Sequence, residues 1–160
     1  MKEKNGEHPL GDAGQMILFG LFVVIWILDS FILHQSTLLA NIIPLAIRLI
    51  ILGVALIIAC TLFKSGHVAV IGEHRPGRVI SNGAFRYVRH PLYLGSILIY
   101  FGLTVSTASL FCLGLLVFMI VFYNFIASYE EKLLEAKFGE AYVAYQKITG
   151  KWLPHLGKKG

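Results

Sequence analysis

The chain alternates long apolar stretches with short polar connections. Apolar residues fill positions 16–33 and 42–63 almost without interruption, and a third apolar stretch covers positions 92–125. A helix needs about 20 residues to cross the hydrocarbon core of a bilayer. We therefore expect one membrane-spanning helix over residues 16–33 and a second over residues 42–63.

The third stretch is too long for one span. As a single helix it would extend roughly 50 Å, well beyond a hydrocarbon core of about 30 Å. The polar residues Ser106, Thr107 and Ser109 interrupt its middle. The pattern predicts a tight hairpin of two helices, which makes four transmembrane helices in all.

A different pattern follows the hairpin. The apolar positions of residues 129–147 share one helical face, with Lys and Glu elsewhere: Leu134, Phe138, Ala141 and Tyr145. This spacing predicts an amphipathic helix lying at the membrane interface, with Gly139 breaking or bending it.

Composition places the whole chain in a membrane. Of its 160 residues, 56% are hydrophobic and only 14% are charged, which is too apolar for a soluble domain of this size. No linker or repeat divides it, so we expect one all-helical, membrane-embedded domain over residues 1–160. We expect five segments: a polar tail (1–15), a first helical pair (16–63), a cytoplasmic loop (64–91), a second helical pair (92–128) and a C-terminal segment (129–160).

The basic residues predict the orientation. Nearly all lie in the N-terminal tail, the 64–90 loop or the C-terminal tail, whereas the connections 34–41 and 106–109 contain no Lys or Arg. Basic segments stay on the cytoplasmic side, so a multi-pass protein with both termini in the cytoplasm is expected, in a bacterial or archaeal cell membrane. Lipid headgroups, rather than nucleic acid, are then the anionic partner of the net charge of +5.

Two charged residues lie inside the predicted spans. Asp29 is about one turn before the end of the first helix, and Arg48 is about two turns into the antiparallel second helix. Isolated charges at such depth are costly, so we expect an intramembrane ion pair, with a substrate contact as the alternative.

Groups capable of chemistry gather at the cytoplasmic end of the predicted hairpin. The two ends of the hairpin lie together, which makes Tyr93 and Glu130 neighbours. Glu130 and Glu131 are adjacent on a helix and point about 100° apart, so we expect one of the two carboxylates to face inward. A solvated acidic pair is the alternative. No Cys or His spacing typical of a metal site occurs, and no metal is expected.

The segment before the third helix can bind an anion. Pro91 suits the first helical turn and biases His90 toward an extended conformation, so free backbone N–H groups should be exposed there. Arg86 and Arg89 add positive charge. Alternatively, these arginines bind headgroups and His90 caps the helix.

Residues 77–154 resemble the isoprenylcysteine carboxyl methyltransferases and the related phospholipid methyltransferases. The resemblance rests on the run SNGAFRYVRHPLYLG at residues 81–95, followed by Glu130, Glu131, Leu134, Phe138, Gly139, Tyr142, Tyr145 and Pro154. It implies a small helical membrane enzyme that transfers a methyl group from S-adenosylmethionine to a lipophilic small molecule or lipid. By the same resemblance the cofactor contacts are Gly77, Arg78, Val79, Ile80, Phe85, His90, Pro91, Leu92, Tyr93 and Glu130, with Tyr93 and Glu130 positioning the reactants.

Two positions depart from the family pattern. Phe85 stands where Tyr is common, which keeps a stacking surface and removes a hydroxyl. Ile126 stands four residues before Glu130, where members that methylate a prenylcysteine carboxylate have Arg. The acceptor is therefore left open among carboxyl, amine and thiol groups.

Two other functions are considered. Membrane sterol reductases have a segment similar to RHPxY that helps bind NADPH, although this chain is short for one. A non-catalytic membrane scaffold is the other, and Ile126 is its best support. Gly66, Gly72 and Gly77 also make a mobile lid conceivable at residues 64–80.

Overall fold

The structure, a computed structural model, describes residues 11–72 and 78–155. Its described part is built from helices, in the order α1 (Gly11–Ile27), the π-helix η1 (Leu28–Leu33), the 3₁₀-helix η2 (Leu38–Asn41), α2 (Leu45–Gly72), the 3₁₀-helix η3 (Gly83–Arg86), α3 (Pro91–Thr107), α4 (Leu110–Phe138) and α5 (Glu140–Ile148). The predicted N-terminal tail falls largely outside the described residues.

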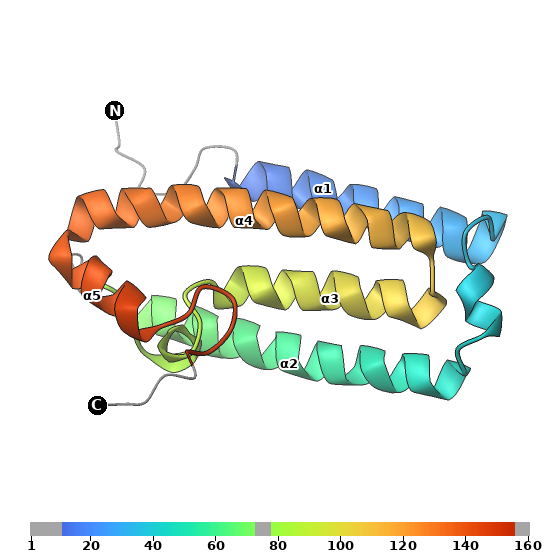
Figure 1. Ribbon diagram of the computed structural model, residues 1–160, viewed down its shortest axis with the longest axis horizontal. Coiled ribbons are helices and arrows are strands. Elements are labelled where there is room, and N and C mark those ends of the chain that lie inside the picture. The colour runs from blue at the N-terminus through green and yellow to red at the C-terminus, as the bar shows by residue number, and fades with distance from the viewer. Residues whose placement is uncertain (1–10, 73–77, 156–160) are drawn as a thin grey trace.

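The four long helices lie along one axis (Figure 1). α2 packs on α3, α3 packs on α4, and α1 packs mainly on α4. α3 and α4 form the predicted hairpin, and its turn lies at Ala108 and Ser109, where the Ser109 hydroxyl accepts a hydrogen bond from the Cys112 N–H at 3.1 Å. At the opposite end of the bundle, the start of α3, the end of α4 and α5 lie together.

Within the described residues, three helical segments are long and apolar enough to cross a membrane: Gly14–Leu33, Leu45–Val70 and Leu110–Phe138. The chain is therefore a membrane protein. α3 is apolar but has only 17 residues, so a count of four spans stays a prediction.

Two helices extend further than the pattern predicts. α2 continues to Gly72, nine residues past the expected end at Phe63, so the first part of the expected loop is helical. α4 continues from the apolar span to Phe138, and only then does Gly139, with φ of +55°, separate it from α5. Residues 64–72 of the conceivable lid are thus part of α2, and residues 73–77, including Gly77, lie outside the described part.

The expected ion pair between Asp29 and Arg48 is wrong. Asp29, which lies in the π-helix, accepts hydrogen bonds from the backbone N–H of Ser36 at 3.0 Å, from the Ser36 hydroxyl at 2.5 Å and from the Ser109 hydroxyl at 2.5 Å. The carboxylate thus joins the α1–α2 connection to the α3–α4 turn.

Arg48 is satisfied separately, by backbone carbonyls. Its guanidinium donates to the carbonyl oxygens of Ser106 at 2.7 Å, Ile43 at 3.1 Å and Ala40 at 3.3 Å. Carbonyls near helix ends lack helical partners. They meet the need of a buried cation for hydrogen bonds without a carboxylate.

This geometry predicts independent effects of the two charges on stability. Asp29→Asn and Arg48→Gln should each lower the free energy of unfolding by about 1–2 kcal/mol, because each removes hydrogen bonds to a charged group. The double variant should show the sum of the two losses to within roughly 0.5 kcal/mol, as sites without a direct interaction do. Thermal unfolding in detergent of the unmodified protein, the two single variants and the double variant measures this. A coupling energy above that bound would show that Asp29 and Arg48 do form an ion pair.

The core lies in the middle of the bundle, between α1, α3 and α4. Phe22, Tyr100, Met119 and Tyr123 are at most 2% exposed, and Phe22 packs on the ring of Tyr100 with centroids 4.8 Å apart. This aromatic cluster fills the centre of the bundle.

Candidate functional site

The segment between α2 and α3 is held against α2 by a close backbone contact. Gly83 begins η3 with φ of +56°, and a Cβ atom there would lie 2.9 Å from the carbonyl oxygen of Ser65. Any other residue would be strained at this φ and would collide with α2. Gly83 thereby lets η3 lie on α2 and places Phe85 beside α5.

A buried tyrosine of α5 connects to the same segment. The Tyr145 hydroxyl donates a hydrogen bond to the carbonyl oxygen of Phe85 at 2.6 Å. Burial raises the pKa of Tyr145 to about 12, so its hydroxyl keeps its proton at neutral pH. This bond joins Phe85 to the C-terminal part of the chain.

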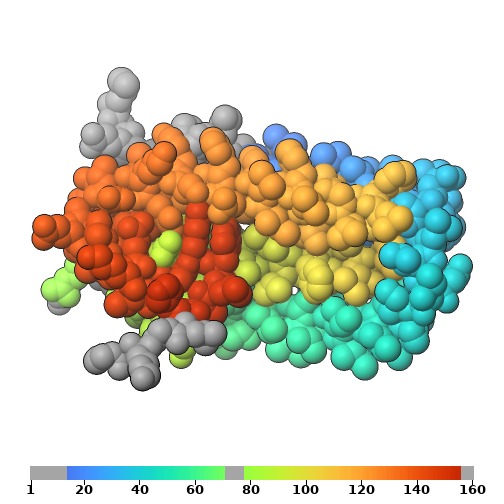
Figure 2. Space-filling view, in the orientation of Figure 1, coloured from blue at the N-terminus to red at the C-terminus, as the bar shows by residue number. Residues whose placement is uncertain are grey.

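The segment after α5 returns to the start of α3. The backbone N–H of Arg89 donates to the Gly150 carbonyl at 2.9 Å, and its guanidinium donates to the carbonyls of Thr149 at 2.5 Å and Gln146 at 3.2 Å. In Figure 2, atoms of α4, α5 and this segment cover that end of the molecule, and the green atoms of residues near 80 show between them.

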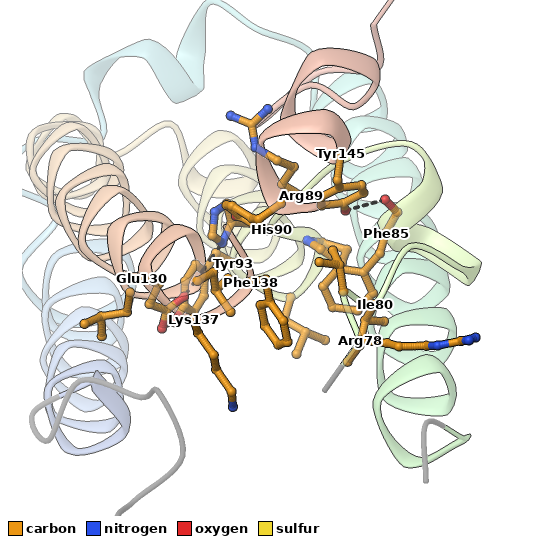
Figure 3. A pocket seen from close by; sticks show the side chains of 16 residues that line it. Arg78, Ile80, Phe85, Arg89, His90, Tyr93, Glu130, Lys137, Phe138 and Tyr145 are labelled. Atoms are coloured by element: carbon orange, nitrogen blue, oxygen red, sulfur yellow. Dashed lines mark hydrogen bonds and ion pairs between the residues drawn. The ribbon is translucent and has the colours of Figure 1, made fainter. Parts of the chain in front are cut away.

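These contacts enclose a cavity of about 350 Å³, called here the site cavity. Its size lies within the range of small-molecule sites, roughly 300–1,000 Å³. It is lined by the segment before α3, the first turn of α3, the end of α4 and α5: Arg78, Val79, Ile80, Phe85, Arg89, His90, Pro91, Leu92, Tyr93, Glu130, Leu133, Leu134, Lys137, Phe138, Tyr142 and Tyr145 (Figure 3).

Every predicted cofactor contact that the structure describes lies on this one cavity. They are Arg78, Val79, Ile80, Phe85, His90, Pro91, Leu92, Tyr93 and Glu130. The remaining predicted contact, Gly77, lies outside the described residues. The structure thus brings together residues that are more than 50 positions apart in the sequence.

The two adjacent glutamates have different surroundings. Glu130 faces the site cavity, where its carboxylate accepts a hydrogen bond from the hydroxyl of Tyr93. Glu131 faces the C-terminal segment, and its Oε1 accepts a hydrogen bond from Arg89 Nε at 2.7 Å. The expectation that one carboxylate of the pair faces inward is confirmed, and it is Glu130.

His90 lies between the two carboxylates. Its Nε2 is 3.1 Å from Glu131 Oε1, and its Nδ1 is 3.8 Å from Glu130 Oε2. Its ring is stacked on that of Tyr93, with an interplanar angle of 3° and centroids 5.6 Å apart. His90 therefore packs the side chain of Tyr93 and connects the cavity to the Glu131 contacts.

The cations of the cavity differ in part from those that the sequence indicated. The charge of Arg89 is already paired with Glu131, and Arg86 does not line the cavity. Arg78, which was an expected contact, and Lys137, which was not, also line it, and their side chains extend outward from it in Figure 3. These two residues are the cations available to an anionic group of a ligand at the rim.

Sequence reasoning missed part of the cavity wall. Leu133, Leu134 and Lys137 follow Glu130 at three, four and seven residues, which places them on one face of a helix. That spacing could have identified them once Glu130 was assigned to the cavity. Leu134, Phe138, Tyr142 and Tyr145 belonged to the resemblance, but no contact was expected of them.

Comparison with known proteins gives one family. The family model described as phospholipid methyltransferase matches residues 41–141, more than half of the chain. The match covers α2, α3, α4 and the first residues of α5, and therefore the segments that build most of the site cavity. No curated protein and no solved structure matches the chain.

Proposed function

This chain belongs to the phospholipid methyltransferase family and is a membrane methyltransferase; we propose that it uses S-adenosylmethionine, bound in the site cavity, to methylate a lipophilic acceptor. The proposal includes a single domain over residues 1–160 and a cytoplasmic location for both termini and the site cavity. The arrangement of charges on the cavity carries it: one carboxylate, two cations at the rim, and apolar or aromatic walls between them.

The residues fit the parts of S-adenosylmethionine. Phe85 and Phe138 offer aromatic surface for a purine ring. Glu130 suits hydroxyl or cationic groups, while Arg78, Lys137 and the N-terminus of α3 suit a carboxylate. A ligand with both charges would thus find a partner of opposite sign at each end.

The chain's part in the reaction is alignment. When bound, S-adenosylmethionine supplies a methyl group on a positively charged sulfur, which an acceptor can take by in-line displacement. Tyr93 and Glu130 hold one another in place by their hydrogen bond, and His90 fixes the Tyr93 ring by stacking. Such positioning residues raise the rate by fixing the angle of approach, and apolar walls keep water out.

The acceptor group is bound by something other than the arginine typical of carboxylate-methylating relatives. Ile126, which stands at the position of that arginine, has an uncharged side chain that is only 4% exposed and packs inside the bundle. An acceptor that carries no negative charge, such as an unprotonated amine or a thiol on a lipid, therefore needs no counter-ion at this position. A carboxylate would need Arg78 or Lys137 at the rim.

Titration of the purified protein in detergent tests the cofactor. We expect saturable binding of S-adenosylmethionine and of S-adenosylhomocysteine by isothermal titration calorimetry, and none of NADPH. Binding of NADPH alone would indicate a reductase, and binding of none of the three would favour a scaffold. Either result would overturn the proposal.

A further inference from the structure

A second cavity lies deeper in the bundle, beside the site cavity. It has a volume of about 310 Å³ and is called here the side cavity. Helices α1, α2, α3 and α4 all contribute to it, through residues that include Phe19, Phe63, Ser96, Tyr100 and Tyr123. Its lining is mainly apolar, unlike that of a site for a charged cofactor.

The two cavities share a wall of aromatic rings. Tyr93 lines the site cavity and Tyr123 lines the side cavity, and their ring centroids are 5.3 Å apart. Tyr93, Ser96 and Tyr100 follow one another at three and four residues on α3, so they lie on one face of the helix. A molecule in the side cavity would thus have one end next to Tyr93, on the side of the site cavity.

The rim of the side cavity is exposed and lies within a candidate membrane span. Its rim residues Met16 and Phe19 are 75% and 50% exposed, although both are apolar and both lie within a candidate membrane span. α1 packs mainly on α4 and α2 on α3, and no extensive packing joins α1 to α2 in the described part of the chain. In Figure 1 the two helices lie at opposite edges of the bundle.

The other end of the side cavity is closed. Tyr100 is 2% exposed and Tyr123 is 1% exposed, and Tyr100 packs on Phe22. The cavity of about 310 Å³ is roughly twice the size of an engineered cavity of about 150 Å³ that binds benzene, which suggests space for on the order of a dozen carbon atoms.

We propose that the side cavity receives the apolar group of the methyl acceptor from the bilayer, and that Tyr100 and Tyr123 set how much of this group it holds. The acceptor's reacting atom then lies at Tyr93, beside the site cavity. This inference rests on the proposed function for the identity of the occupant. Ser96 needs no polar ligand, because its hydroxyl already donates to the Leu92 carbonyl at 3.2 Å.

Photolabelling in phosphatidylcholine nanodiscs tests the occupancy. The probe is an alkyl chain of about twelve carbons with a terminal diazirine, and adducts are located by mass spectrometry. We expect adducts on Phe63 and Tyr100 in the unmodified protein. Ser96→Phe should reduce them about tenfold, the loss expected when about two methylene groups are excluded from the cavity.

Thr61→Phe is the matched control. The Thr61 hydroxyl also donates to a carbonyl four residues earlier, that of Ile57 at 2.8 Å, but Thr61 is exposed and lines neither cavity. Labelling should be unchanged in this variant. Equal labelling in Ser96→Phe and Thr61→Phe would overturn the proposal, and Ile99→Phe gives a second variant that fills the cavity if Ser96→Phe does not fold.

A methyl-transfer assay identifies the occupant. With labelled S-adenosylmethionine and a membrane lipid extract, Ser96→Phe should lose transfer while its affinity for S-adenosylmethionine is unchanged. Loss of labelling with full transfer would mean that the cavity holds a bilayer lipid that is not the acceptor, which overturns the inference. An unmodified protein that binds no S-adenosylmethionine would overturn the proposed function, while photolabelling would still decide whether the cavity takes an alkyl chain.

Discussion

Glu130→Gln is expected to weaken the binding of S-adenosylmethionine by about 10- to 100-fold, the usual loss when a hydrogen bond to a charged group is removed. Glu130 provides the carboxylate among the described residues that line the site cavity, and it accepts a hydrogen bond from Tyr93. Glutamine has the same size and can still accept that bond. The loss of affinity therefore measures the contribution of the negative charge of Glu130 to binding of the ligand. Calorimetric titration determines this loss.

Glu135→Gln is the control for this experiment. Glu135 lies on the same helix, is exposed and does not line the site cavity. Its replacement removes the same charge from the protein and should leave the affinity unchanged. Equal affinities of the unmodified protein and of Glu130→Gln would show that the cofactor does not contact this carboxylate, even if the protein binds S-adenosylmethionine elsewhere.

The membrane helices could be predicted because apolar length alone determines them. An apolar run of about 20 residues has few alternatives to a spanning helix. The hairpin then places Tyr93 beside Glu130, because two antiparallel helices joined by a short turn bring their far ends together. The contact between these residues follows from that geometry, and the structure confirms it.

The helix end at Gly72 could not be predicted from hydrophobicity. The uninterrupted apolar run ends at Phe63, and a loop was expected to follow it. The helix nevertheless continues, and it forms the surface on which Gly83 and η3 pack. Such packing between segments far apart in sequence overrides a local pattern.

The partners of the buried charges could not be predicted from the sequence either. Asp29 and Arg48 have similar expected depths, but hydroxyl groups and backbone carbonyls at the helix ends satisfy them separately. Arg89 was expected to attract an anionic ligand and instead binds Glu131 and the C-terminal segment. Several of these partners, among them Ser36 and Thr149, lie in connections between or after helices, whose path has no periodic pattern.

Glu131→Gln should destabilise the protein by about 3 kcal/mol, because removing one partner of a largely buried ion pair leaves the other charge unpaired. Glu131 and Arg89 are each 13% exposed at the side chain and are 2.7 Å apart, and Lys151 Nζ lies 4.0 Å from the same carboxylate. For a chain of this size that loss corresponds to a fall in the melting temperature of roughly 6–12 °C. Thermal unfolding in detergent measures it.

A double-mutant cycle separates the ion pair from other effects of the substitution. Arg89→Met should also destabilise the protein, but Arg89→Met combined with Glu131→Gln should lose less than the sum, with a coupling energy of at least about 1 kcal/mol. Glu135→Gln, which removes an exposed charge from the same helix, should change stability by less than about 0.5 kcal/mol. Additive losses in the cycle would show that Glu131 and Arg89 do not stabilise one another. The segment around Thr149 would then be held at the start of α3 by the hydrogen bonds that Arg89 donates to the carbonyls of Gly150, Thr149 and Gln146, without a contribution from Glu131.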